Sequence, residues 1–254
     1  MSAAPPATKI RLTGVSKRFG DKVVLDGLDF EIPEGDTVVV LGGSGSGKSV
    51  LLKHMIGLLR PDSGSIVVDG VELDTLDGAE LTEFRRRYGM AFQEGALFDS
   101  MSVYDNVAFP LRRAGWDRGR IEQRVAECMD MVHLEGAERK MPAELSGGMR
   151  RRVGFARAIA LEPRILLFDE PTTGLDPVIK AVIDEVIVEL QVKLGSTAVV
   201  ITHDLDSAFR IADRVALLFR GKIVACAPPA QFQALDDPRV VQFIRGLPRG
   251  PLTE

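Results

Sequence analysis

The sequence has too few cysteines and too short apolar runs for several classes of protein. Only two cysteines occur among its 254 residues, Cys128 and Cys226, and their spacing matches neither a disulfide framework nor a metal site, which favours a reducing compartment. No apolar run approaches the roughly 18 residues that a membrane-spanning helix requires. Residues 1–7 lack the basic flank and apolar core of a secretory signal. These absences predict a soluble intracellular protein.

The chain also lacks a strong excess of charge of either sign. Lysine and arginine number 32 and aspartate and glutamate 36, which gives a net charge of −4 and argues against a nucleic-acid partner. No internal repeat or low-complexity segment interrupts the sequence. Hydrophobic residues make up 45% and charged residues 27%, as in ordinary globular proteins. The length suits one large domain or two small ones.

Hydrophobic patterning predicts an α/β fold. Apolar and polar residues alternate over residues 10–15 and 28–33, which is typical of antiparallel strands with one wet face. Residues 37–41, 165–168 and 197–201 are short, β-branched or leucine-rich apolar runs, which are typical of parallel strands buried on both faces.

A helix is predicted between the last two of these strands. Asp176 caps its start, Pro177 takes the first helical position and Gly195 ends it. This strand–helix–strand unit predicts an α/β core. The apolar positions that recur at helical spacing are Ile179, Val182, Ile183, Val186 and Leu190.

The middle of the chain predicts helices and no strand between Ser102 and His133. Ser102 and Asp105 can form a capping box, and Asp117 can open a second helix. The buried stripe expected for that second helix is Ile121, Val125, Met129 and Val132.

Two more strands are expected late in the chain, at residues 215–219 and 222–225. The expected organisation is a single domain with three parts. They are a core from residues 8–92 and 160–227, a helical subdomain at 93–159 and a C-terminal tail at 228–254.

A glycine-rich loop follows the apolar run at residues 37–41 and fits the phosphate-loop template, in which Gly and any four residues precede Gly-Lys-Ser. Its glycines let successive backbone N–H groups converge on an anion, and the helix that follows adds its positive N-terminal end. We expect Lys48 to reach the β- and γ-phosphates and Ser49 to bind Mg²⁺; the alternative is a merely flexible loop. The candidate phosphate-binding residues are Gly42, Gly43, Ser44, Gly45, Ser46, Gly47, Lys48 and Ser49.

Two carboxylates follow the apolar run at residues 165–168. Asp169 stands where a phosphoryl-transfer enzyme places a Mg²⁺ ligand, and Glu170 can orient or deprotonate the attacking water. By itself such an acidic pair is more often a turn or a helix cap. The phosphate loop elsewhere in the chain favours the catalytic interpretation.

A second phosphate-binding pattern precedes a basic helical stretch at residues 150–160. Ser146, Gly147 and Gly148, followed by Met149, place small residues at a helix start. One γ-phosphate does not need two such sites. The second therefore predicts a role in a partner subunit.

Together these motifs resemble the nucleotide-binding subunit of an ABC transporter over about residues 8–227. Phe19 stands where that family places an aromatic ring that stacks on adenine, and Gln93 follows a strand-like segment as the family's Q-loop glutamine does. Asp176 resembles the D-loop aspartate, and His203 the switch histidine that follows a strand.

Each of these four residues has a structural alternative. Phe19 can belong to the core and Asp176 also suits a helix cap, while Gln93 and His203 mean little alone. The other histidines, His54 and His133, are expected to be structural.

The resemblance implies a phosphate-loop, RecA-like parallel core with an N-terminal antiparallel β subdomain and an inserted helical subdomain. It also implies a head-to-tail homodimer that holds two ATP molecules and hydrolyses them. Glu170 would activate water, and Gln93 and His203 would sense the γ-phosphate and Mg²⁺. The implied Mg²⁺ ligands are Ser49, Gln93 and Asp169. The residues implied to contact ATP on the partner are Ser146, Gly147, Gly148, Met149 and Asp176.

Transport would require a separate permease. An apolar patch after Gln93 is suited to receive a permease helix, although its residues can instead pack inside the helical subdomain. Its members are Ala96, Leu97, Phe98, Met101 and Val103.

Three features of the sequence are similar to ATPases of the Mla/MCE type. They are Met149, at a position where most ABC members have Gln, and the segments 92–98 and 237–244. That similarity implies phospholipid movement between the bacterial inner membrane and the outer envelope, with the ATPase on the cytoplasmic face. It also implies a permease, a periplasmic MCE-domain protein and, in some systems, a small STAS-domain protein. The tail would pack against either subunit through Val240, Val241, Phe243 and Ile244.

Two alternatives stay open. One is the ATPase of an importer for a polar solute. The other is a non-transport ABC protein, which the single cassette and the absence of sustained heptads disfavour.

Overall fold

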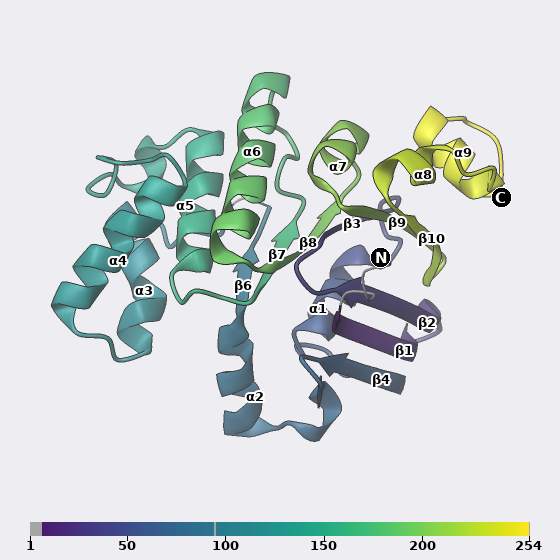
Figure 1. Cartoon of the computed structure of the whole chain (residues 1–254), viewed down its shortest axis with the longest axis horizontal. Coiled ribbons are helices and arrows are strands. Elements are labelled where there is room, and N and C mark those ends of the chain that lie inside the picture. The colour runs from purple at the N-terminus through teal and green to yellow at the C-terminus, as the bar shows by residue number, and fades with distance from the viewer. Residues whose placement is uncertain (1–6, 94, 254) are drawn as a thin grey trace, which may run out of the picture. The chain divides into compact units, whose positions relative to one another are not determined.

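The chain forms two units in the computed structural model, which describes residues 7–93 and 95–253. The first unit contains the chain up to Thr82 and from Ile201 onward, and the second contains Glu83–Val200. The chain enters the second unit within α2 (Gly78–Phe84) and leaves it within β8 (Thr197–Thr202) (Figure 1). The helical segment expected at residues 93–159 lies inside the second unit.

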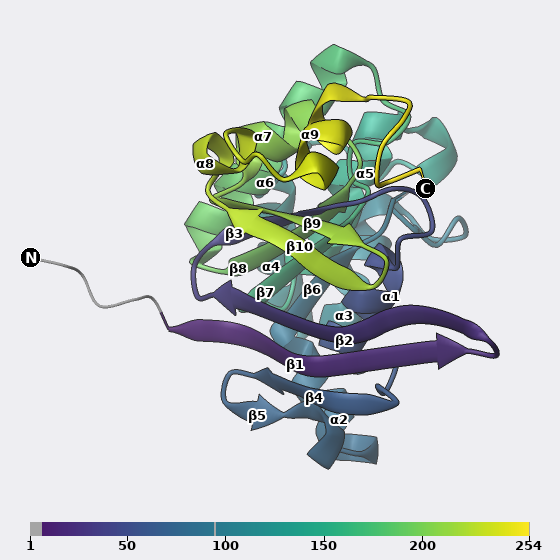
Figure 2. The same cartoon turned by 90° about the vertical axis from the view of Figure 1, so that its right-hand side faces the viewer.

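An antiparallel sheet in the first unit has the strand order β2-β1-β4-β5. Figure 2 shows β1 and β2 as a long hairpin. The expected pair at residues 10–15 and 28–33 is confirmed, and both strands run to 12 residues. The strands are β1 (Thr8–Phe19), β2 (Lys22–Pro33), β4 (Ser63–Val68) and β5 (Val71–Glu72).

Three further strands of the first unit lie in the order β10-β9-β3. β3 (Thr37–Leu41) is buried along its whole length and pairs in parallel with β9 (Arg214–Phe219). β10 (Lys222–Ala227) runs antiparallel to β9. The helices α1 (Lys48–Met55) and α7 (Leu205–Ile211) and the short 3-10 turn η1 (Leu73–Thr75) complete this part.

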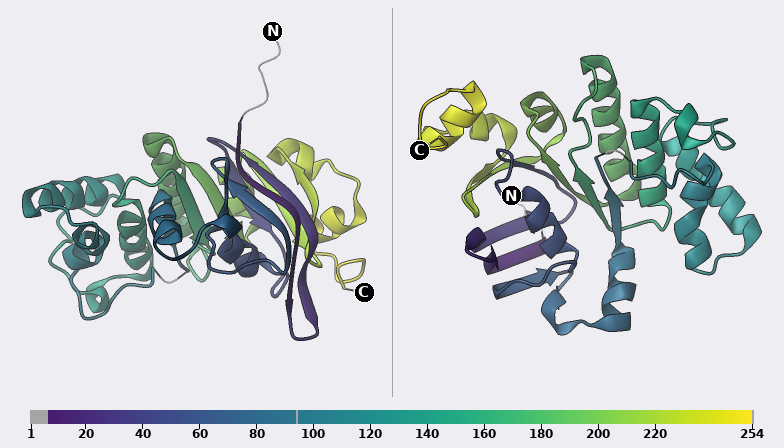
Figure 3. Two further views of the ribbon diagram at one scale, coloured as in Figure 1. Left: turned by 90° about the horizontal axis from the view of Figure 1, so that it is seen from below. Right: turned by 180° about the vertical axis from the view of Figure 1, so that it is seen from behind.

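The C-terminal tail packs within the first unit. Its helices α8 (Pro229–Gln233) and α9 (Pro238–Arg245) contact each other, and α8 lies against β9 and β10 (Figures 1 and 3). The buried Gln242 side chain donates to the Leu247 carbonyl at 3.1 Å and accepts from the Leu252 N–H at 2.8 Å. These bonds fix the segment after α9 against the Gln242 side chain.

The second unit combines parallel strands with long helices. Its strand order is β8-β7-β6, and β6 and β7 pair in parallel. The helices α3, α4 and α5 contact one another, and α5 also contacts β6 and α6. Its remaining elements are η2 (Arg85–Arg87), β6 (Tyr88–Ala91), α3 (Val103–Arg113), α4 (Arg118–Met131), η3 (Pro142–Glu144), α5 (Gly147–Ile159), β7 (Ile165–Asp169) and α6 (Pro177–Leu194).

The helix ends expected from the sequence are confirmed. The side chains of Ser102, Asp117 and Asp176 accept hydrogen bonds from backbone N–H groups at the starts of α3, α4 and α6. Gly195 ends α6 with φ of 57°, a left-handed conformation that favours glycine. Among the described residues, no helix has both the length and the hydropathy needed to cross a bilayer.

Candidate functional site

The glycine-rich loop connects β3 to α1 and is shaped around its glycines. A Cβ atom at Gly42 would lie 2.6 Å from Ser46 Oγ and 2.7 Å from the Leu218 carbonyl oxygen. Gly47 has φ of 105°, and a Cβ atom there would lie 3.1 Å from the Val24 carbonyl oxygen. Neither position accepts a larger residue without strain.

Polar groups that suit a bound phosphate gather in this loop. The buried Lys48 Nζ donates to the Gly42 carbonyl at 2.8 Å and to the Gly43 carbonyl at 3.1 Å. Ser49 is exposed in the first turn of α1. Ser46 Oγ is buried and has no hydrogen-bond partner among the described residues. A helix start, an ammonium group and a hydroxyl without a partner together fit the oxygens of a phosphate chain.

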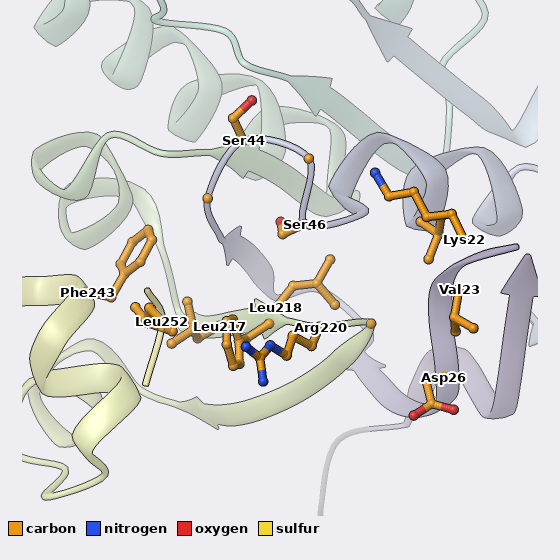
Figure 4. A pocket seen from close by; sticks show the side chains of 15 residues that line it. Lys22, Val23, Asp26, Ser44, Ser46, Leu217, Leu218, Arg220, Phe243 and Leu252 are labelled. Carbon is orange, nitrogen blue, oxygen red and sulfur yellow. The ribbon is translucent and has the colours of Figure 1, made fainter. Parts of the chain in front are cut away.

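A cavity of about 640 Å³ adjoins the loop within the first unit (Figure 4). Loop residues 43–46 form one side, and β2 residues 22–24, the β9–β10 turn, Phe243 and Leu252 form the others. This volume falls in the range of small-molecule pockets. The cavity has room for the part of a phosphorylated ligand that extends beyond the loop.

Two other expected residues of the first unit lie at strand ends. Phe19 closes β1 with a side chain that is 48% exposed, so the alternative that it belongs to the core is wrong. His203 is exposed and follows β8 directly. His54, by contrast, is fully buried with Nδ1 2.7 Å from the Val50 carbonyl oxygen, and His133 Nε2 lies 3.1 Å from Glu189 Oε2. Both take the structural roles expected of them.

The two acidic residues after β7 are in the second unit. Asp169 ends the strand and Glu170 follows it with φ of 50°. This left-handed conformation is uncommon for a residue other than glycine and costs on the order of 1–3 kcal/mol. The Thr173 hydroxyl donates to Glu170 Oε2 at 2.9 Å. The carboxylate is therefore held in a set orientation on a strained turn.

Gln93 lies in the loop after β6, and this loop is seated on α5. The Gln93 side chain is exposed, while the Gln93 backbone carbonyl accepts a hydrogen bond from Arg151 Nε at 2.8 Å. A Cβ atom at Gly95, where φ is 76°, would lie 2.6 Å from the Arg150 carbonyl oxygen. The neighbouring Glu94, part of the expected segment 92–98, lies outside the described residues.

The serine–glycine pattern starts α5 as expected. Ser146 Oγ accepts from the Met149 N–H at 3.3 Å, and Ser146 and Gly147 are exposed. Gly148 is buried, and a Cβ atom there would lie 2.6 Å from Ile179 Cγ2 in the first turn of α6. The start of α5 thus packs closely against the start of α6, which Asp176 caps.

The apolar patch after Gln93 is smaller than the sequence predicts. Val103 is fully buried as the first residue of α3, so it supports the helices from within. Phe98 remains 42% exposed, with its ring centroid 4.9 Å from that of Phe109. The two rings line a groove of about 380 Å³ together with Phe92 and Arg157. We call this groove the aromatic groove.

The expected site residues are therefore divided between the units. The first unit carries Phe19, residues 42–49 and His203. The second carries Gln93, residues 146–149, Asp169, Glu170 and Asp176. Sequence reasoning missed the bonds made by Arg151 and Arg157, for which the basic stretch at residues 150–160 was the available signal.

Comparisons with known proteins agree on one family. A family model described as ABC transporter matches residues 25–173. The probable ribonucleotide transport ATP-binding protein mkl of Mycobacterium leprae is 42% identical over 249 residues, which cover 98% of this chain and 72% of the relative. The intermembrane phospholipid transport system ATP-binding protein MlaF of Escherichia coli is 40% identical over 247 residues, which cover 97% of this chain and 92% of the relative.

Solved structures also resemble this chain. A dimeric post-hydrolysis state of the ATP-binding cassette MJ0796, bound to ADP and Pi, matches with a TM-score of 0.78 and 33% identity, over 87% of this chain and 98% of that one. The cbiO1 protein of Clostridium perfringens, part of the ABC transporter complex cbiONQ, matches with a TM-score of 0.84 and 30% identity, over 95% of each chain.

Proposed function

Because the chain belongs to the ABC transporter family, as an ATP-hydrolysing subunit, we propose that it powers the movement of phospholipid between the inner membrane and the outer envelope of a bacterium. The observation that carries this proposal is the identity to MlaF along 97% of this chain and 92% of that relative. The ATPase sits on the cytoplasmic face of the inner membrane and is attached there through a permease. A periplasmic MCE-domain protein completes the system, to which some systems of this type add a small STAS-domain protein.

ATP binds with its triphosphate on residues 42–49 and its adenine on Phe19. The Lys48 ammonium, the buried Ser46 hydroxyl and the start of α1 support the placement of the triphosphate. Mg²⁺ would be held by oxygen atoms of Ser49, Gln93 and Asp169, which are ligands of the kind it prefers. When bound, the metal neutralises charge on the β- and γ-phosphates.

Hydrolysis depends on Glu170 as the residue that orients and deprotonates water. The bond from the Thr173 hydroxyl to Oε2 orients the carboxylate for this role. Gln93 and His203 contact the γ-phosphate side of the site and so detect whether the γ-phosphate is present.

Two copies pair head to tail around two ATP molecules. Each nucleotide contacts the partner at the start of α5, where Ser146 and Gly147 are exposed, and near Asp176. Gly148 and Met149 complete that surface. The free energy difference between the paired and separated copies, set by the γ-phosphate, drives the permease.

The aromatic groove receives the permease. Arg157 lies with its guanidinium carbon 5.6 Å from the Phe98 ring centroid and donates to the Gly95 and Ala96 carbonyls, both at 2.9 Å. Burial lowers the pKa of the Arg157 guanidinium from its usual value. An exposed aromatic surface backed by a fixed cation fits the apolar face of a short permease helix.

Purification from detergent-solubilised membranes tests both the cargo and the groove. We expect the tagged chain to bring down a membrane permease together with phospholipid, identified by mass spectrometry. Phe98→Glu should lose the permease, because a charge would be desolvated in the groove, while keeping its own ATPase activity. The control is Val192→Glu, at a position on α6 that is 68% exposed. Recovery of a permease without lipid, alongside a solute-binding protein, would instead favour the polar-solute importer, and recovery of no permease would contradict a transport role.

A further inference from the structure

We propose that Arg151 is a positioning residue that ties Gln93 and Glu170 to the helix bearing Ser146. The groups that act on a subunit's own nucleotide would then move together with the surface that contacts the partner's nucleotide. The inference rests on the proposed function for the roles of those residues, and on the contacts of Arg151 for the link between them.

The Arg151 side chain is only 7% exposed and binds two loops at once. Its Nε–H donates to the Gln93 carbonyl at 2.8 Å, and its Nη2 donates to the Thr173 carbonyl. A buried guanidinium requires such partners, because an ion without them is costly in a protein interior. The planar fork of arginine suits two acceptors at fixed positions, which the single ammonium of lysine does not match.

The bond to Thr173 reaches the catalytic carboxylate. Thr173 closes the turn after β7, with its backbone N–H donating to the Glu170 carbonyl at 3.4 Å and its hydroxyl donating to Glu170 Oε2 at 2.9 Å. Glu170 is held in a left-handed conformation within this turn. Arg151 therefore positions Thr173, and Thr173 in turn positions the Glu170 carboxylate.

The bond to Gln93 belongs to a tightly packed contact. A Cβ atom at Gly154 would lie 2.8 Å from the Cα atom of Gly95, and one at Gly95 would lie 2.6 Å from the Arg150 carbonyl oxygen. The loop after β6 therefore rests on the backbone of α5. A displacement of the helix must displace this loop as well.

The helix that carries Arg151 also carries the serine–glycine pattern. Ser146 caps α5 five positions before Arg151, which is about 7.5 Å along the axis at roughly 1.5 Å per residue. The arginine thus joins two loops to the exposed end of one short rigid element. The neighbouring Arg152 makes chemically similar bonds elsewhere, to the Val132 carbonyl at 3.2 Å and the His133 carbonyl at 2.8 Å beyond the end of α4. Arg152 is therefore a matched control.

The test measures kcat and KM for ATP, with the thermal unfolding midpoint, in the full chain carrying Arg151→Gln, Arg151→Lys or Arg152→Gln. Arg151→Gln should lower kcat by about 10²-fold, the effect of a small misplacement of catalytic groups, while KM stays within about two-fold, because the two loops that Arg151 binds, after β6 and after β7, are not the loop of residues 42–49. Arg151→Lys should retain an intermediate kcat, and it serves as the folded substitute if Arg151→Gln does not fold. Arg152→Gln should leave kcat within two-fold of the unchanged chain.

A double-mutant cycle with Thr173→Val separates positioning from stability. If Arg151 acts through Thr173, the loss of kcat in the double variant should be no larger than the greater of the two single losses. Losses that multiply, or equal losses of kcat in Arg151→Gln and Arg152→Gln, would overturn the inference. Because the reference is ATP hydrolysis by the unchanged chain, these outcomes are independent of the recovery of permease and lipid that tests the proposed function.

Discussion

Glu170→Gln is expected to lower the rate of ATP hydrolysis by roughly 10²–10⁴-fold, the usual contribution of a general base. The amide keeps the shape of the side chain and can still accept from the Thr173 hydroxyl, but it cannot take a proton from water. ATP binding should therefore remain, and the paired state should accumulate because its γ-phosphate is no longer removed. Steady-state hydrolysis, nucleotide titration and size-exclusion chromatography with ATP and Mg²⁺ measure the three effects.

The control for this variant is Glu185→Gln, at an exposed carboxylate on α6. It should hydrolyse ATP at the rate of the unchanged chain and form no long-lived pair. Turnover by Glu170→Gln within a few-fold of normal would remove Glu170 from the role of base.

Lys48→Ala is expected to weaken ATP binding by roughly 10- to 150-fold, since a hydrogen bond to a charged group contributes about 1.5–3 kcal/mol. The change also removes the two hydrogen bonds that Lys48 Nζ donates to the Gly42 and Gly43 carbonyls, at 2.8 and 3.1 Å. Titration with a fluorescent ATP analogue measures the dissociation constant, and the thermal unfolding midpoint shows whether the fold is intact.

Lys53→Ala is the matched substitution, because Lys53 is an exposed lysine on the same helix. Its affinity for ATP should stay within two-fold of the unchanged chain. Equal affinities for the Lys48 and Lys53 variants would contradict the placement of the triphosphate on the loop.

The elements that sequence reasoning predicted well are those with local signals. β3 is an apolar run between polar turns, and the caps at Ser102, Asp117 and Asp176 are set by side chains next to the backbone groups that they bind. The phosphate loop and the start of α5 are also local, because glycine and serine act on their own backbone.

What the sequence could not predict depends on residues far apart in the chain. β4 pairs with β1 about fifty positions away, and its short Ser-Gly-Ser start carries no clear strand pattern. Arg151 lies in a basic run typical of a solvated helix face. Its burial is decided by carbonyls 58 and 22 positions away. The left-handed Glu170 likewise has no signature in its own neighbours.

Crosslinking between two differently tagged copies tests the central claim, that ATP joins two copies head to tail. One copy carries Ser44→Cys and the other Ser146→Cys, both with Glu170→Gln and with the exposed Cys226 changed to serine. Cys128 can stay, because burial raises the pKa of its thiol to about 11 and keeps it unreactive. The account predicts a crosslinked pair of unlike copies with ATP and Mg²⁺ and none without nucleotide. A crosslink that never forms, or that forms equally without nucleotide, would contradict it.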